Sequence, residues 1–197
     1  MTNILILGAN GQIARVAIDL FFKHPDVHLT LFLRRVKRLK VLPSDRVNVI
    51  EGDVVDSKEL QAAMVGQDVV YANLNGSLEQ MARNIVQSMN ASGIKRLIWI
   101  SSMGIYDEIP GERHGSILEP YCKSVALIEA SNLDYTILRP AWLNDKDEIA
   151  YESTQKGEPF KAADKQVSRK SVADLVVKLA TKPGLEIRSS LGVNKAK

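Results

Sequence analysis

The sequence predicts an α/β fold, in which one doubly wound parallel sheet has helices on both faces. Strand and helix signals alternate along the 197 residues, and this alternation is typical of βαβ units. The first strand, residues 3–7, runs directly into a glycine turn and then into a helix. Because crossovers between parallel strands are right-handed, helices should cover both faces, and we expect a single domain over residues 1–197.

Each expected element has a local signal. The helix over 12–23 has apolar residues at helical spacing, including Ile13, Ala17 and Phe21, and it ends before Pro25. The expected strands cover residues 3–7, 28–33, 47–50, 68–72, 97–100, 135–138 and 186–190. The other expected helices cover residues 58–65, 78–92, 120–131 and 171–182.

The helix starts and the strand order can also be predicted. We expect Ser57 and Ser171 to be N-caps, because a serine oxygen accepts a hydrogen bond from a free amide of the first turn. We expect the strand order 3-2-1-4-5-6, with ligands bound beyond the carboxyl ends of the strands. A small irregular substrate cap is expected from residues 104–118 and 143–168.

The turn Gly8-Ala-Asn-Gly11-Gln-Ile-Ala14 is the most informative stretch of the chain. It places bare backbone N–H groups at a helix N-terminus, where the helix dipole favours an anion. Gly8 lets the strand turn sharply, Gly11 lets a pyrophosphate approach the backbone, and Ala14 lets the helix pack closely. The turn therefore predicts a dinucleotide site. Its expected contacts are Gly8, Asn10, Gly11, Gln12 and Ile13.

Basic residues follow the second strand, beginning with Arg34. In an NAD site, an acidic residue about 20 positions beyond the glycines binds the ribose 2′-hydroxyl. A guanidinium in that place suits a 2′-phosphate, with Arg35, Lys37 or Arg38 as auxiliaries. The sequence therefore favours NADP(H) over NAD(H). The alternative is a solvated basic turn.

Other strand ends carry small or polar residues that suit a cofactor. Asp53 is placed to accept a hydrogen bond from adenine and Val54 to pack on its ring, although Asp53 also fits an ordinary turn aspartate. The turn Asn73-Leu74-Asn75 can approach the ribose and phosphate. The further candidate cofactor contacts, after the fifth and sixth strands, are Ser101 and Pro140.

Five segments of the chain together resemble one protein family. They are Gly8–Ala14, Gly52–Asp56, Ile100–Tyr106, Tyr135–Pro140 and Ser168–Asp174. These motifs resemble the atypical and extended short-chain dehydrogenase/reductases, particularly the small NmrA-like NAD(P)-binding proteins. The resemblance covers nearly the whole chain and implies a Rossmann-like fold with an NAD(P) cofactor.

The resemblance also implies an active site of a serine, a tyrosine and a lysine four residues after the tyrosine. Ser102 and Tyr121 match the first two, but Val125 stands where the lysine is expected. Lys123 lies roughly 200° around a regular helix from Tyr121 and cannot replace that lysine. Tyr121 is therefore a general acid, a ribose ligand or an ordinary helix-start aromatic. Ser102 is either a substrate contact or part of a strand-end turn.

Composition excludes several classes of protein. The net charge of +3 is too small to indicate nucleic-acid binding, and no apolar run reaches the ~18 residues of a membrane span. The start of the chain has no basic region typical of a signal peptide, and the single cysteine fits a reducing, cytoplasmic compartment. The histidines are scattered, so no metal site is predicted.

Two functions fit these observations. The first is an NADP(H)-dependent oxidoreductase that acts on a small or planar acceptor, such as a quinone, a flavin or a carbonyl compound. Met103, Tyr106 and Trp142 either form an apolar platform for that acceptor or pack in the core. The second is a non-catalytic NADP(H)-binding redox sensor that binds a partner protein, which the missing lysine favours. A homodimer is the alternative to a protein partner.

Overall fold

A computed structural model describes residues 1–39, 44–109, 111 and 115–196. Its helices are α1 (Gln12–Phe21), α2 (Ser57–Ala63), α3 (Leu78–Ser92), α4 (Glu119–Glu129) and α5 (Arg169–Thr181), with a 3-10 helix η1 (Val36–Arg38). Its strands are β1 (Thr2–Leu7), β2 (Val27–Leu33), β3 (Val47–Glu51), β4 (Val69–Ala72), β5 (Arg96–Ile100), β6 (Asp134–Pro140), β7 (Leu143–Asn144), β8 (Tyr151–Gln155), β9 (Val167–Ser168) and β10 (Ser189–Lys195).

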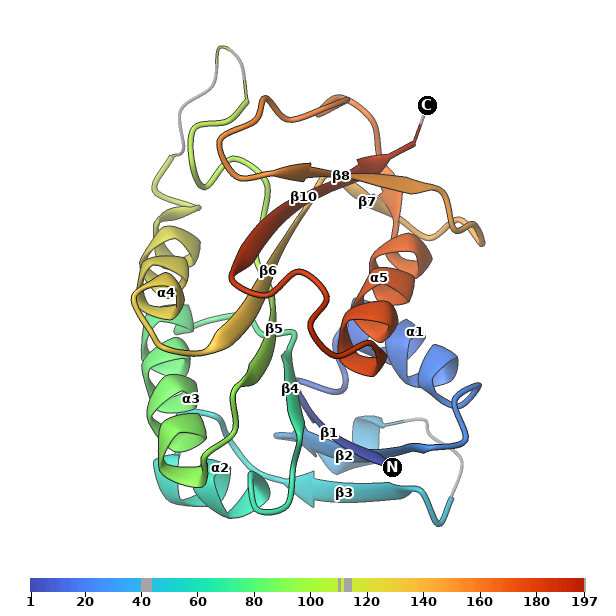
Figure 1. The fold of residues 1–197 in the computed structure, drawn as a ribbon, viewed down its shortest axis with the longest axis vertical. Coiled ribbons are helices and arrows are strands. Elements are labelled where there is room, and N and C mark those ends of the chain that lie inside the picture. The colour runs from blue at the N-terminus through green and yellow to red at the C-terminus, as the bar shows by residue number, and fades with distance from the viewer. Residues whose placement is uncertain (40–43, 110, 112–114, 197) are drawn as a thin grey trace.

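In the described residues, eight strands form one sheet in the order β3-β2-β1-β4-β5-β6-β10-β8 (Figure 1). The glycine turn follows β1, which is parallel to β2 on one side and to β4 on the other. Helices α2, α3 and α4 cover one face of the sheet, while α1 and α5 cover the other (Figure 1). The doubly wound parallel fold and the strand order 3-2-1-4-5-6 are therefore confirmed.

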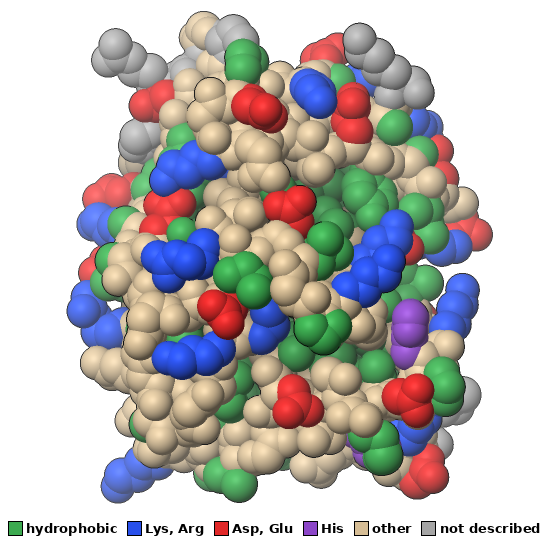
Figure 2. Space-filling model, in the orientation of Figure 1, with side chains coloured by type: hydrophobic (Ala, Val, Ile, Leu, Met, Phe, Trp, Pro, Cys, Tyr) green, Lys and Arg blue, Asp and Glu red, His purple; other side chains and the backbone are tan. Residues whose placement is uncertain are grey.

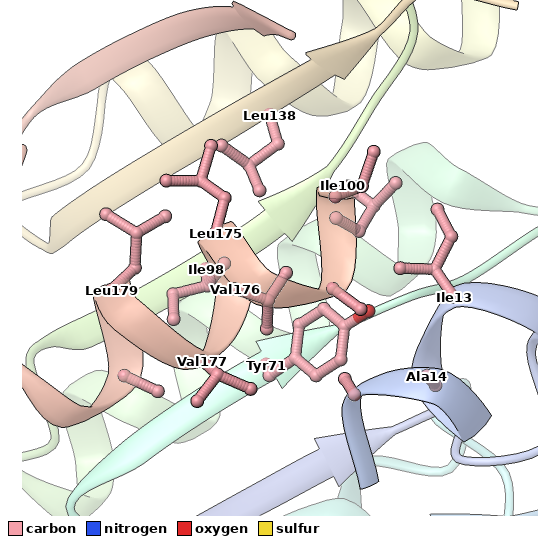
Figure 3. Close-up of a cluster of buried hydrophobic side chains, with 14 of the residues drawn as sticks. Ile13, Ala14, Tyr71, Ile98, Ile100, Leu138, Leu175, Val176, Val177 and Leu179 are labelled. Carbon is pink, nitrogen blue, oxygen red and sulfur yellow. The ribbon is translucent and has the colours of Figure 1, made fainter. Parts of the chain in front are cut away.

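Alternate residues of each central strand face opposite helical layers. Ile4 and Ile6 belong to the apolar cluster beneath α1 and α5, whereas Leu5 and Leu7 belong to the cluster beneath α2, α3 and α4. Figure 3 shows the first cluster, where side chains of α1 and α5 meet those of β4, β5 and β6. Burial on both faces explains why these strands are near-continuous apolar runs, and it fixes their carboxyl ends along one edge.

The last strand is displaced from its predicted place. We expected it at 186–190, but it begins at Ser189 and runs to Lys195. Glu186 and Arg188 have φ values of 51° and 54°, a left-handed backbone that turns the chain and cannot continue a strand.

The expected cap over residues 143–168 contains strands that the sequence did not reveal. β8 pairs antiparallel with β10 and forms an edge of the main sheet, while β7 and β9 form a separate parallel pair. The β8 sequence lacks an apolar alternation because only Thr154 of this edge strand is buried. The cap is therefore partly an extension of the sheet.

Two helix starts also differ from the predicted ones. Asp56, not Ser57, caps α2, because one carboxylate oxygen accepts two amides of the first turn at 2.9 and 3.1 Å. Ser168, not Ser171, caps α5, and its hydroxyl oxygen accepts the Ser171 amide at 3.0 Å. Each helix begins earlier than expected because the preceding polar side chain reaches its free amides.

The outer surface carries charges of both signs. On the face in Figure 2, Lys and Arg side chains alternate with Asp and Glu side chains. No helix in the described part of the chain is long and apolar enough to cross a membrane.

Candidate cofactor and active site

A cavity of about 350 Å³ opens at the carboxyl ends of β1, β2, β3 and β4. It brings together predicted contacts from four separate strand ends. These are Gly8, Asn10, Gly11, Arg34, Arg35, Asp53, Val54, Asn73, Leu74 and Asn75. The auxiliary Arg38 also lines the cavity. The predicted contacts that do not line it are Gln12, Ile13, Ser101 and Pro140.

Four further lining residues were not among the predicted contacts. Phe32 and Leu33 are the last residues of β2, and Gly52 directly precedes the predicted Asp53. Their places beside predicted contacts were a usable signal. Met81 comes from α3, and its approach depends on how that helix packs, for which the sequence offers no signal.

The glycine turn is built for close backbone approach. Gly8 has φ 78°, and a side-chain carbon there would lie 2.3 Å from the carbonyl oxygen of Asn73. Gly11 is the N-cap of α1 and provides no side-chain cap, and the first turn has no acidic residue. Within the described residues, the first amides of α1 are therefore free of a side-chain partner. This donor set fits the pyrophosphate of a dinucleotide.

The Asn73 side chain lies directly over this turn. A side-chain carbon added at Gly11 would be 2.3 Å from the Asn73 amide nitrogen. The space beside Gly11 thus holds a hydrogen-bond donor rather than being empty. The side chain of Asn10 is fixed separately, since Arg15 donates to its oxygen at 2.8 and 3.1 Å.

A basic wall closes the β2 side of the cavity. It consists of Arg34, Arg35 and Arg38, all three of which are exposed. Among the residues that the structure describes, none of these guanidinium groups has a hydrogen-bond or ion-pair partner. The η1 turn that carries Arg38 is held by Glu51, which accepts the Val36 amide at 3.3 Å. Three unpaired cations on one wall match the charge of a phosphate.

The β3 side of the cavity is fixed by short polar contacts. The Asp53 carboxylate accepts the Val55 amide at 3.1 Å, so it forms the turn that was the alternative to adenine binding. The Asp53 amide donates to Glu59 at 3.0 Å. The buried Asn84 donates to the carbonyl oxygens of Val54 and Val55, both at 3.0 Å. This wall is therefore held in place by hydrogen bonds to side chains of α2 and α3.

Of the predicted catalytic residues, Ser102 follows β5, the next strand along the same edge, and Tyr121 lies in α4. Ser102 is half-buried, and its hydroxyl donates to the Met103 carbonyl at 3.1 Å. The neighbouring Ser101 hydroxyl is buried and has no partner in the described residues. Tyr121 is half-buried in the first turns of α4 and packs against the core.

The helix around Tyr121 is regular, so Lys123 points elsewhere. Lys123 pairs with Glu119 one turn earlier, at 2.7 Å, and both side chains are exposed. Val125, at the position of the expected lysine, is 1% exposed. The structure thus supplies Tyr121 with no cation from its own helix.

The three apolar residues after β5 and β6 do not form one platform. Met103 is buried, whereas Trp142 is 67% exposed. The Tyr106 hydroxyl donates to Glu129 at 2.8 Å, and burial raises the pKa of this phenol above its ordinary value. Of these three residues, Trp142 is the most exposed to solvent.

A second cavity of about 500 Å³ lies between the first turns of α3 and α4. It is lined by Gly76, Ser77, Leu78, Glu79, Gln80, Ser116, Glu119, Pro120 and Lys123. Its first lining residue along the chain, Gly76, directly follows Asn75, which lines the cofactor cavity.

The sequence matches the NAD(P)H-binding protein family over residues 8–183, so the chain belongs to that family. It is similar to a Rossmann-fold NAD(P)-binding family protein from Shigella flexneri, with 43% identity, a TM-score of 0.90, and coverage of 99% of this chain and 94% of that one. It is also similar to a short-chain dehydrogenase/reductase (wide type) from Veillonella parvula DSM 2008 in complex with NADP, with 31% identity, a TM-score of 0.88 and coverage of 98% and 94%. An uncharacterized sugar epimerase, YhfK, from Bacillus subtilis (strain 168) is 28% identical over 159 residues, which are 73% of each chain. The predicted resemblance to short-chain dehydrogenase/reductases is thereby confirmed.

Proposed function

We propose that this protein is a cytoplasmic NADP(H)-dependent oxidoreductase that reduces a small planar acceptor, such as a quinone, a flavin or a carbonyl compound. The observation that carries the proposal is the wall of three guanidinium groups in the cofactor cavity, none of which has a partner among the described residues. The single cysteine, Cys122, supports the compartment. The NADP in the Veillonella relative supports the cofactor.

Within this proposal, each strand end has a role in holding the cofactor. The free amides of α1 and the turn from Gly8 to Ile13 bind the pyrophosphate. Arg34, with Arg35, binds the 2′-phosphate. Asp53 and Val54 face the adenine, and Asn73, Leu74 and Asn75 approach the ribose and phosphate.

The acceptor half lies beyond β5 and β6. Ser101 and Pro140 border the nicotinamide end, and Trp142 stacks on the plane of the acceptor. The Ser102 hydroxyl turns from the Met103 carbonyl to donate its proton to the acceptor. When bound, the cofactor supplies hydride transfer, and the protein supplies position. Because Val125 leaves Tyr121 without a cation from α4, we assign the proton to water and give Tyr121 a role in contacting ribose.

Titration and an acceptor panel test this function. NADPH should bind at least about tenfold more tightly than NADH, and a quinone or flavin should then oxidise it. Trp142→Ala should raise the KM for the acceptor and leave the Kd of NADPH unchanged. Equal affinities for the two cofactors would contradict the NADP(H) preference.

The second candidate is a non-catalytic NADP(H) sensor that binds a partner protein. The buried Val125 at the lysine position favours it. It predicts the same NADPH affinity but no oxidation by any acceptor, so the panel separates the two functions.

A further inference from the structure

A buried ion pair joins the loop after β5 to the end of β6. Arg139, the second-last residue of β6, has a side chain that is 1% exposed. It pairs with the carboxylate of Glu108, whose side chain is 7% exposed. Such a pair gains little stability over well-packed apolar residues, because removing two charges from water is costly. The contacts that this ion pair makes are therefore more informative than its contribution to the free energy of unfolding.

The Glu108 carboxylate holds the loop that follows β5. It accepts the amides of Gly104 at 3.1 Å and Tyr106 at 2.9 Å, while the Glu108 carbonyl accepts the Phe160 amide at 3.4 Å. The loop turns sharply here, with φ 86° at Gly104 and 54° at Asp107. One carboxylate thus fixes the course of the chain just after Ser102.

The Arg139 guanidinium connects this loop to the far end of the sheet. It donates to the Ser190 hydroxyl at 3.1 Å, to the Ser190 carbonyl at 3.2 Å and to the Thr154 carbonyl at 3.4 Å. Its carbon lies 5.1 Å from the Tyr106 ring centre and 5.9 Å from that of Phe160. β8 and β10, which provide these partners, lie at the end of the sheet away from β3 (Figure 1).

The loop begins beside the cofactor cavity. In the β4–β5 register, Ala72 pairs with Trp99, so the chain after β5 emerges next to the turn of Asn73 and Leu74. The Ser101 amide also donates to the Leu138 carbonyl of β6 at 2.7 Å. The contacts of Glu108 with the rest of the loop therefore set the direction in which the chain leaves this edge at Ser102.

We infer that Glu108 and Arg139 are positioning residues, which hold the loop after β5 so that Ser102 faces an acceptor bound beside the nicotinamide. This inference rests on the proposed function. Neither side chain contacts the cofactor cavity, so their effect is on the acceptor step and not on cofactor binding.

The test compares Arg139→Met with Arg96→Met, the same change at an arginine that lies at the opposite end of β5 and β6. Arg96 starts β5, and it donates to the carbonyl oxygens of Asp134, Leu179 and Leu185. Arg96→Met therefore also removes a multiply bonded arginine between β5 and β6. A third variant, Glu108→Gln/Arg139→Met, removes both charges and leaves no unpaired carboxylate in the interior.

Three readouts are needed: the Kd of NADPH, kcat with the acceptor that the panel identifies, and hydrogen exchange at the Gly104 and Tyr106 amides. In Arg139→Met and in the double variant, kcat should fall more than about tenfold while the Kd changes less than about twofold. Exchange at both amides should rise in these two variants. Arg96→Met should change none of the three, although its thermal stability should fall.

Two results would overturn the inference. One is unchanged kcat in the double variant at a temperature where it is folded. The other is an equal loss of kcat in Arg96→Met, because the effect would then follow stability alone. A wild-type protein that binds NADPH but reduces no acceptor overturns the proposed function, and the exchange rates then still decide whether the pair holds the loop.

Discussion

The carboxyl edge of the sheet has two parts whose polar groups behave differently. Beyond β1 to β4, donors are left over: the α1 N-terminus has no side-chain cap, and Arg34 has no partner among the described residues. Beyond β5 and β6, Glu108, Arg139 and Tyr106 bind one another, although the buried Ser101 hydroxyl has no partner in the described residues. The first part is complementary to an anion that a ligand brings, whereas the second has its geometry set before any ligand arrives.

The largest expected effect breaks the first part at the glycine turn. Gly11→Val should weaken NADPH binding by about 100-fold or more, or about 2.7 kcal/mol, because its side chain would take the space of the Asn73 amide and of the phosphate. Fluorescence titration measures the loss, and circular dichroism checks the fold. The obstructing atom belongs to the Asn73 side chain. The double variant Gly11→Ala/Asn73→Ala should therefore bind NADPH more tightly than Gly11→Ala alone. A folded Gly11→Val protein with unchanged affinity would place the phosphate elsewhere.

The next effect sharpens the role of the unpaired cations. Arg34→Ala should lose about 1.5–3 kcal/mol of NADPH binding, or roughly 10- to 150-fold, with little change for NADH. The control is Lys37→Ala, since Lys37 carries the same charge on η1 but does not line the cavity. Isothermal titration with both cofactors provides the comparison. Similar losses for NADPH and NADH in Arg34→Ala would show that this residue does not read the 2′-phosphate.

A smaller effect is expected in the second part of the edge. Tyr121→Phe should lower NADPH-dependent turnover by less than the ~10²–10⁴-fold typical of a lost general acid, because Lys123 is paired with Glu119 and Val125 is apolar. The measurement is the pH–rate profile of the wild type and the variant. A thousandfold loss, together with a titration near neutral pH that vanishes in Tyr121→Phe, would reveal a proton relay built by another route.

The smallest effect concerns the helix that follows the β3 wall of the cavity. Asp56→Ala should lower the free energy of unfolding by about 1 kcal/mol, since two amides of α2 lose their acceptor. Ser57→Ala, one residue later, should stay within about 0.5 kcal/mol of the wild type. Urea denaturation measures both variants. The reverse order of the two losses would restore Ser57 as the cap.

Most of the parallel core could be predicted from the sequence because strands buried on both faces are uninterrupted apolar runs. Residues 3–7 show this plainly. β8 could not be predicted in the same way, since an exposed edge strand needs no apolar alternation. The final strand was misplaced because the left-handed backbone at Glu186 and Arg188, two residues without a glycine's freedom, has no clear sequence signal.

The cofactor cavity was predictable for a topological reason. A doubly wound sheet brings the residues after four strands to one edge, so Gly8, Arg34, Asp53 and Asn73 meet there. The loop after β5 was not predictable, because Arg139 reads as an ordinary charged residue until β8 and β10 provide its partners. Contacts between residues so far apart in the chain leave no local pattern.

The place of β10 between β6 and β8 also orders events during synthesis. Chains emerge from the ribosome N-terminal end first, so β1, β2, β3 and β4 can pair before the second half is made. β8 has no neighbour in the sheet until β10 appears, and Ser190 of β10 is the partner of both Arg139 and Tyr106. A nascent chain therefore completes its glycine turn early, whereas the loop after β5 gains its contacts with Ser190 only when β10 is made.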